Sequence, residues 1–339
     1  MSEPTTQSQN QNLSVAIVIP NWNGEHLLTD CLNALMKALH SCGGDYEVIV
    51  VDDASTDRSV EIIRGNFPSV KLLVNERNEG FAKSANRGAA AASSRIVYLL
   101  NTDVIVGENF LTPVVRHFER GDVFAVSSES YYDNGVTLRE GRKTVLLRNI
   151  WFYGASARRL HNAHSNQPAF SIMATGGHSA FNREKFLELG GFDSLFHPFY
   201  WEDSDICYRA WMRGWKVINE PASRVRHKSA GVISTILPRR EINAIGHRNR
   251  MIFIWKNLSA WNILMPHFLG LTLRIVISTI MLDRCFWRSF IYAARRLPEI
   301  LKKRKQLQNS RVLKDMQILR IVSSSSNTDK TTPEIVNSF

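Results

Sequence analysis

Residues 46–57 read YEVIVVDDASTD, a run of β-branched and apolar side chains that ends in two aspartates and a cluster of turn-forming residues. Three similar runs stand nearby: VAIVIP at 15–20, VKLLVN at 70–75 and RIVYLL at 95–100. Near-continuous apolar runs of this length are typical of parallel strands that are covered on both faces. We therefore predict four buried strands in the N-terminal third of the chain.

Segments with the helical spacing of apolar residues lie between these strands, at 25–40, 57–66 and 80–92. Ser55 or Thr56 is a candidate cap for the second helix. The alternation of strand and helix predicts an α/β fold, a doubly wound and mostly parallel sheet with flanking helices. Ligands of such sheets bind beyond the carboxyl ends of the strands.

The loop after the first predicted strand excludes two common nucleotide-binding fingerprints. It reads PNWNG at 20–24, whereas a dinucleotide site needs GxGxxG and a P-loop needs GxxxxGK[ST], and the chain contains neither. Polar residues nevertheless follow every predicted strand, so a single ligand could contact all four strand ends. These residues are Pro20 and Asn21, Asp52 and Asp53, Asn75 to Gly80, and Asn101, Thr102 and Asp103.

Positive charge is concentrated towards the C-terminus. The 339 residues carry a net charge of +11, and residues 239–320 alone contain 17 Lys and Arg against 4 Asp and Glu. Because no nucleic-acid recognition motif accompanies this charge, an anionic membrane surface is the expected partner and nucleic acid is not. A solvated helical hairpin that packs on the preceding domain, or that makes a homo-oligomer, is the alternative.

The segment 261–282, WNILMPHFLGLTLRIVISTIML, is long enough to span a bilayer. Pro266, His267 and Arg274 make a span costly, so we expect a helix that lies in the membrane interface or packs on protein. The next segment, 283–306, mixes aromatic and basic side chains, which suits the headgroup region of an anionic membrane.

Seven segments, taken in order, resemble the glycosyltransferases of family 2. Each is weak by itself, but their common order makes chance similarity a poor explanation. They are IVIPNWNG (17–24), VVDDASTD (50–57), NEGFAKSANRG (78–88), LLNTD (99–103), TGGHSAFNREKFLELGGFD (175–193), WEDSDICYRAWMRGW (201–215) and His227.

The resemblance implies an inverting enzyme with the GT-A fold. The NTD and WED segments are similar to bacterial rhamnosyltransferases of O-antigen and cell-wall polysaccharide synthesis. We therefore expect transfer of a sugar, rhamnose from dTDP-rhamnose, to a lipid-linked or nascent polysaccharide acceptor. A non-catalytic relative that binds sugar nucleotides or glycans, and a membrane adaptor that acts through its basic region, are the alternatives.

The domain organisation follows from this resemblance and from composition. Four cysteines without a CxxC pair, and a first segment without an apolar core, favour a cytoplasmic protein on the inner face of the membrane. The predicted parts are a flexible leader (1–14), a GT-A catalytic domain (15–238) with a nucleotide-binding half (15–103) and an acceptor-binding half (104–238), a basic helical membrane-associating region (239–320) and a disordered tail (321–339).

The resemblance also implies a donor site. Asp52 would accept the ring N–H of a pyrimidine base, to which a carboxylate is suited. An Asx turn is the alternative for Asp52 and Asp53, and turn formation is the alternative for Asn78 and Gly80. The implied nucleotide-sugar-binding residues are Pro20, Asn21, Asn23, Asp52, Asp53, Asn78, Gly80, Asn86, Asn101 and Asp103.

Asn101, Thr102 and Asp103 stand where the family places its DxD element, which holds a divalent cation, Mn²⁺ or Mg²⁺, against the donor diphosphate. Here Asn101 replaces the first aspartate, so one carboxylate is lost. The resemblance implies that Asp103 and His227 are the metal ligands, and an imidazole suits Mn²⁺ better than Mg²⁺. An ordinary strand-end turn is the alternative for the tripeptide.

By resemblance, Asp203 is the catalytic base, and Glu202 and Trp201 beside it help to position the acceptor. We expect the N-terminus of the following helix to keep Asp203 ionised at neutral pH. Helix capping is the alternative for the acidic residues, and core packing is the alternative for Trp201. Gly176 and Gly177 resemble an acceptor-side loop in which glycine lets the backbone approach a ligand closely.

Overall fold

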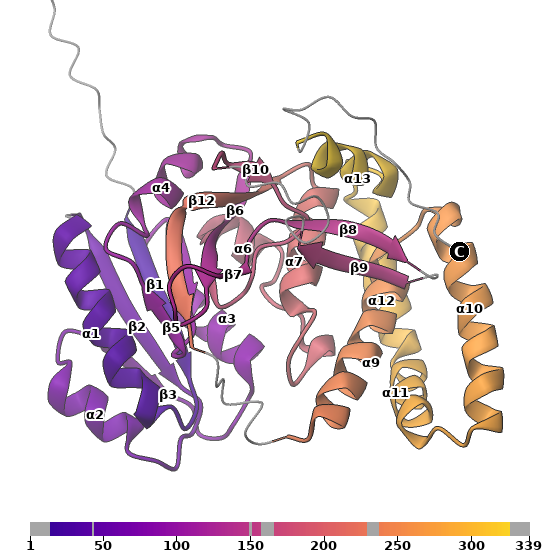
Figure 1. The fold of residues 1–339 in the computed structure, drawn as a ribbon, viewed down its shortest axis with the longest axis horizontal. Helices are drawn as coiled ribbons and strands as arrows, with labels where there is room; N and C mark the ends of the chain where they lie inside the picture. The colour runs from indigo at the N-terminus through magenta and orange to yellow at the C-terminus, as the bar shows by residue number, and fades with distance from the viewer. Residues whose placement is uncertain (1–13, 43, 149–150, 157–165, 229–236, 326–339) are drawn as a thin grey trace, which may run out of the picture.

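The computed structural model describes residues 14–42, 44–148, 151–156, 166–228 and 237–325. Figure 1 shows a large sheet with flanking helices, and beside it a layer of long helices from the C-terminal third. The predicted leader lies outside the described residues apart from Ser14, and so does the predicted tail beyond residue 325.

The first half of the sheet forms as the sequence predicts. Its elements are β1 (Val15–Asn21), α1 (Glu25–Cys42), β2 (Tyr46–Asp52), α2 (Ser59–Asn66), β3 (Lys71–Val74), α3 (Phe81–Ala91) and β4 (Ile96–Leu100). β1 pairs in parallel with both β2 and β4, and β2 pairs in parallel with β3. Alternate residues of β1 pack into two apolar clusters, one with α1 and one with α3, which explains the continuous apolar run.

The predicted cap of α2 is wrong. Neither Ser55 nor Thr56 caps this helix; Arg58 precedes it, and Asp57 Oδ1 accepts from the backbone N–H of Ser59 at 3.0 Å. The Ser55 hydroxyl instead donates to Asp52 Oδ2 at 2.6 Å. The loop after β2 is therefore held by side chains that face the end of the strand.

The second half of the sheet is mixed. Its elements are β5 (Val104–Val106), α4 (Thr112–Val115), η1 (Arg116–Glu119), β6 (Val123–Tyr131), β7 (Leu138–Glu140), β10 (Ala169–Phe170), β11 (His178–Asn182), α6 (Arg183–Glu188), η2 (Ser194–Phe196), α7 (Glu202–Met212) and β12 (Lys216–His227). The strand order is β10-β12-β6-β11-β4-β1-β2-β3, with β5 beside β12 and β7 beside β6. β11 runs antiparallel to both of its neighbours, β4 and β6. A separate hairpin consists of β8 (Lys143–Arg148) and β9 (Trp151–Ser156).

The C-terminal third is helical, as predicted. Its helices are α9 (Arg239–Asn257), α10 (Trp261–Ile280), α11 (Arg284–Arg295), α12 (Leu297–Asn309) and α13 (Asp315–Ser324). The predicted start of the disordered tail at residue 321 is wrong, because α13 extends to Ser324. Val322 is 1% exposed, and its carbonyl accepts from Arg142 Nη2 at 2.6 Å.

One apolar cluster joins the sheet to these helices. It runs from Ala16 and Val18 of β1 through Trp211 of α7 to Phe253 of α9 and Ile318 of α13. The C-terminal helices thus complete the core of the α/β domain and are not a detached appendage. Removing them would expose the inner face of α7 to water.

Candidate functional site

The loops after β1 and β2 are joined by a dense set of hydrogen bonds. Asn21 Nδ2 donates to Asp52 Oδ2 at 2.9 Å, and the backbone N–H of Ser55 donates to Asp52 Oδ1 at 2.9 Å. Asn23 Oδ1 accepts from the N–H of Thr56 at 2.8 Å. Asp52 is fully buried, and both of its carboxylate oxygens accept hydrogen bonds from the protein. The structure therefore agrees with the alternative that Asp52 forms a turn. Its contact with a base stays a prediction.

Asp53 holds the loop that follows β3. Its carboxylate accepts from Asn75 Nδ2 at 2.6 Å and from the backbone N–H groups of Glu79 at 2.9 Å and Gly80 at 2.7 Å. Gly80 has φ +84°, a conformation that favours glycine. Asn78 lies exposed in the same loop. Asp53 therefore orders this loop from within.

Asn86, a predicted nucleotide-sugar-binding residue, makes two hydrogen bonds within the protein. Its Nδ2 donates to the carbonyl of Phe192 at 2.9 Å, and its Oδ1 accepts from the N–H of the same residue at 2.8 Å. A Cβ on Gly191 would lie 2.3 Å from Asn86 Oδ1. The amide thus clamps α3 to the segment before η2, and its part in the nucleotide-sugar site stays a prediction.

A chain of close contacts joins the end of β4 to the start of α7. The backbone N–H of Asn101 donates to the carbonyl of Gly177 at 2.9 Å, and the N–H of Gly176 lies 3.4 Å from Asp203 Oδ2. A Cβ on Gly177 would stand 2.5 Å from Asn101 Nδ2. A Cβ on Gly24 would meet both Asn21 and Thr102. The fold therefore gathers the predicted donor loops and Asp203 at one edge of the sheet.

Asp103 and His227 form a pair at this edge. Asp103 Oδ2 lies 3.2 Å from His227 Nε2, and both side chains are largely buried. Asp103 Oδ1 and His227 Nδ1 have no hydrogen-bond partner among the described residues. An orphaned carboxylate oxygen beside an imidazole fits a divalent cation. The described residues contain no group of three or more acidic, His or Cys side chains that could hold a metal, so Asp103 and His227 would supply two of an ion's ligands.

His178 and Glu140 belong to the same region, and sequence reasoning gave them no role. His178 is 1% exposed, and its ring lies 6.2 Å from that of His227. Both of its nitrogens lack a hydrogen-bond partner within the described residues, and Glu140 Oε2 is 3.8 Å from Nε2. Although burial raises the pKa of Glu140, His178 and Lys143 hold it well below its usual range. The glycine pair before His178 was the available signal; Glu140 stands in no motif.

Asp203 lies in the first turn of α7, half-buried. Burial raises the pKa of Asp203. The backbone N–H groups of Ser204 and Gly176 lower it by less, so the net shift is upward. Desolvation therefore outweighs the N–H groups of the first helical turn, and the ionised state of Asp203 at neutral pH stays a prediction. Burial and the adjacent Asp203 also raise the pKa of Glu202 to about 8, so Glu202 is protonated at neutral pH.

Trp201 packs on the C-terminal helices. Its backbone is left-handed, with φ +78°, and its ring centroid lies 5.2 Å from that of Phe253 in α9. The core-packing alternative thus describes this side chain. Acceptor stacking on it stays a prediction.

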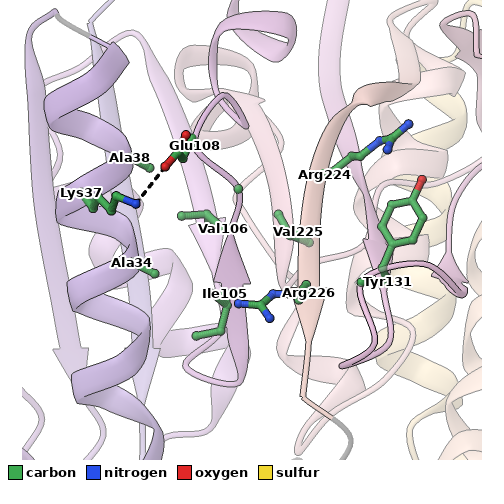
Figure 2. Close-up of a pocket in the computed structure, with 12 residues that line it drawn as sticks. Ala34, Lys37, Ala38, Ile105, Val106, Glu108, Tyr131, Arg224, Val225 and Arg226 are labelled. Carbon is green, nitrogen blue, oxygen red and sulfur yellow. Dashed lines mark ion pairs between the residues drawn. The ribbon is translucent and has the colours of Figure 1, made fainter.

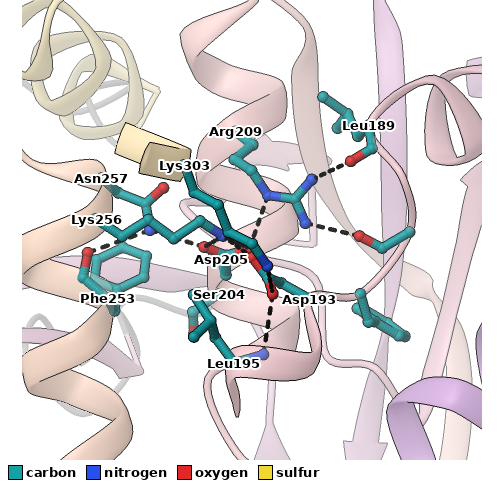
Figure 3. Close-up of polar contacts among 12 residues, drawn as sticks. Leu189, Asp193, Leu195, Ser204, Asp205, Arg209, Phe253, Lys256, Asn257 and Lys303 are labelled. Atoms are coloured by element: carbon teal, nitrogen blue, oxygen red, sulfur yellow. Dashed lines mark hydrogen bonds and ion pairs between the residues drawn. The ribbon is translucent and has the colours of Figure 1, made fainter. Parts of the chain in front are cut away.

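A buried ionic cluster fixes the helix that carries Asp203 (Figure 3). Asp205, fully buried in α7, accepts from Arg209 Nε at 2.7 Å, from Lys256 Nζ at 2.8 Å and from Asn257 Nδ2 at 2.8 Å. Asp193 accepts from Lys256 at 2.5 Å and from Lys303 at 2.6 Å. Burial alone would raise the pKa of Asp193, but Lys256 and the other donors hold it well below its usual range. Helices α7, α9 and α12 are thereby tied together.

A separate cavity of about 350 Å³ lies between α1, β5 and β12 (Figure 2). Arg224 and Arg226 project from β12 there, with the Arg224 guanidinium 5.5 Å from the centre of the Tyr131 ring. Lys37 and Glu108 form an ion pair of 2.8 Å across its rim. None of the predicted site residues lines this cavity, so it is distinct from the edge that holds Asp203.

Comparison with known proteins supports the fold. Polypeptide N-acetylgalactosaminyltransferase 4 from Caenorhabditis elegans is 26% identical over 190 residues, which cover 53% of this chain and only 32% of that protein. A structure of GalNAc-T7 with UDP, GalNAc and Mn²⁺ has a TM-score of 0.56 at 20% identity, covering 73% of this chain and 48% of that one. A structure of S. aureus TarS in complex with UDP-GlcNAc has a TM-score of 0.54 at 17% identity, covering 92% and 91%.

The family itself is defined by a match over the N-terminal half. The family model described as Glycosyl transferase family 2 matches residues 16–188, which are more than half of the 339-residue chain. The match includes the loops after β1, β2 and β4 and the Gly176-Gly177 segment. The chain belongs to glycosyl transferase family 2.

Proposed function

We propose that this protein transfers a sugar from a nucleoside-diphosphate donor to an acceptor hydroxyl with inversion at the anomeric carbon. The observation that carries this proposal is the chain of contacts from Asp103 and Asn101 through the glycine pair to Asp203. It provides polar groups for a leaving diphosphate and a carboxylate for an incoming hydroxyl at one edge of the sheet.

Asp203 is the base in this proposal. The acceptor oxygen attacks the anomeric carbon while the bond to the diphosphate breaks, and the hydroxyl proton passes to Asp203. A raised pKa makes Asp203 a better proton acceptor than an ordinary carboxylate. Glu202, protonated at neutral pH, does not compete for the proton.

Asp103 and His227 would hold a divalent cation, Mn²⁺ before Mg²⁺ because of the imidazole. When bound, such an ion neutralises the charge that develops on the leaving diphosphate. Asn101 offers an amide where the family pattern has a carboxylate, so it contributes hydrogen bonds and no charge.

Rhamnose from dTDP-rhamnose is the donor that the sequence predicts. The curated relative above is named for N-acetylgalactosamine, so UDP-GalNAc is the second donor to test. A lipid-linked or nascent polysaccharide remains the proposed acceptor. The predicted cytoplasmic location suits activated sugars made in that compartment.

The test is turnover of a panel of UDP-, dTDP- and GDP-sugars by the full chain, with and without Mn²⁺. Hydrolysis or transfer of one donor in the presence of the ion supports the proposal. Thermal stabilisation by a donor without turnover under any condition would favour the non-catalytic alternative. Asp203→Asn is the matched control, because it should retain donor binding and lose turnover.

A further inference from the structure

Helix α10 exposes an apolar face along its whole length. Within the described residues it is the one helix long and apolar enough to cross a membrane, at 20 residues, and only 28% of its most apolar window is buried. In Figure 1 it forms the outermost layer of the helical side, farthest from α1 and α2. Its exposed large apolar side chains are Trp261, Met265, Phe268, Leu269, Leu273, Val276, Ile277 and Ile280, and Met281 and Leu282 follow directly.

The opposite face of α10 is fixed to the protein. Ile263, Leu264 and Leu271 are buried in the shared core, and Trp255 Nε1 donates to His267 Nε2 at 3.0 Å. A bilayer span would have to strip this face of its partners on α9. The helix therefore lies against the body of the protein with one side open.

The charged residue in the middle of α10 is neutralised away from the open face. Arg274 donates to Asp283 Oδ2 at 2.6 Å, and its guanidinium lies 5.4 Å from the centre of the Phe286 ring on α11. Its charge is thus directed towards α11. Binding of the open apolar face to a membrane therefore does not require the charge of Arg274 to be desolvated.

Part of the basic charge of residues 239–320 is internal. Lys256 and Lys303 bind the buried carboxylates of the ionic cluster, and Arg304 donates to the carbonyl of Trp255. Other cations of α11 and α12 remain exposed, although Arg288 lies 3.9 Å from Glu241 and Arg296 lies 3.1 Å from Glu299. These exposed residues are Arg284, Arg288, Arg295, Arg296, Lys302 and Lys305.

We propose that the open face of α10 is a docking surface for an anionic bilayer, with the helix lying in the interface and the exposed cations of α11 and α12 at the headgroups. An exposed apolar helix that is followed along the chain by helices with exposed cations fits such a surface. A second copy is a poorer occupant, because two copies of this net positive helical region repel each other. The proposal does not depend on the transfer reaction, and it favours a lipid-linked acceptor.

The test is co-sedimentation of the full chain with phosphatidylcholine vesicles that contain or lack phosphatidylglycerol. We expect binding to the anionic vesicles that weakens as salt is added. Leu269→Glu with Leu273→Glu places two charges in the open face, where both side chains are more than 60% exposed, and should weaken binding by about a hundredfold.

Val136→Glu is the matched control, because Val136 is 79% exposed but lies far from α10 in the sequence, between β6 and β7. It should bind vesicles as the wild type does, and the α10 variant should still melt cooperatively and hydrolyse donor. Failure of the wild type to bind anionic vesicles, or equal binding by the α10 variant, would overturn the proposal. So would a wild-type dimer in vesicle-free buffer that the α10 substitutions convert to a monomer.

Discussion

Replacing Lys256 by Met removes the cation at the centre of the cluster that holds α7. Its ammonium group donates to Asp205 at 2.8 and 2.9 Å and to Asp193 at 2.5 Å, and its side chain is 2% exposed. Met fills most of the space of the lysine stem, so the loss is one of charge pairing and not of packing. Asp205 keeps Arg209 and Asn257, whereas Asp193 keeps Lys303.

The expected loss of stability follows from these bonds. Hydrogen bonds to charged groups contribute about 1.5–3 kcal/mol each, and breaking a buried ion pair by removing one partner costs about 3–5 kcal/mol. We expect Lys256→Met to lower the free energy of unfolding by about 3–5 kcal/mol, and the melting temperature by about 4–7 °C. Because Asp205 is two residues from Asp203, turnover should fall as well.

Urea denaturation followed by circular dichroism measures this loss. Lys303→Met is the control, since Lys303 contacts only the Asp193 end of the cluster and is 30% exposed; it should cost about 1 kcal/mol. The pKa of Asp193 is lowered in the folded state, so its contribution is present above its unfolded pKa of about 4 and is lost as the pH falls below it. The difference between wild type and variant should therefore shrink in acid. A loss equal to that of Lys303→Met, or one that grows in acid, would refute the reasoning.

Three further outcomes concern the site. Asp203→Asn should lower kcat by about 10²–10⁴-fold with donor affinity nearly unchanged, and a loss below about tenfold in steady-state kinetics would remove Asp203 as the base. Asp103→Ala should raise the Mn²⁺ concentration needed for half-maximal turnover, and an unchanged metal titration would place the ion elsewhere. Turnover should fall as the pH rises through about 8 because Glu202 ionises there; Glu202→Gln should abolish that alkaline limb, and an unaltered pH profile would contradict the role of neutral Glu202.

The N-terminal half of the fold was predictable because one physical pattern determines it. Strands that are covered on both faces must be apolar throughout, as β1 is, and parallel strands must bring their polar ends to one edge. The meeting of Asn101, the glycine pair and Asp203 follows from that topology. The mixed second half was harder to predict from the sequence. There β11 pairs with β4 and β6, which both lie far before it in the sequence.

The individual roles of motif residues were harder to predict. Asn86 binds the backbone of Phe192, which is 106 residues away, and Trp201 packs on Phe253. A motif specifies the side chain but not whether its partner is a ligand or another part of the protein. The same holds for Lys256, whose place in a basic region gives no sign that its charge points inward.

The shared apolar cluster has a consequence for how the chain unfolds. Residues from β1 to α13 contribute to one continuous interior, and the ion pair between Lys256 of α9 and Asp205 of α7 joins the C-terminal helices to the α/β part. Neither part can lose its packing while the other remains native, since each forms a wall of the same interior. Calorimetry should accordingly record a single endotherm, with a van't Hoff enthalpy equal to the calorimetric one.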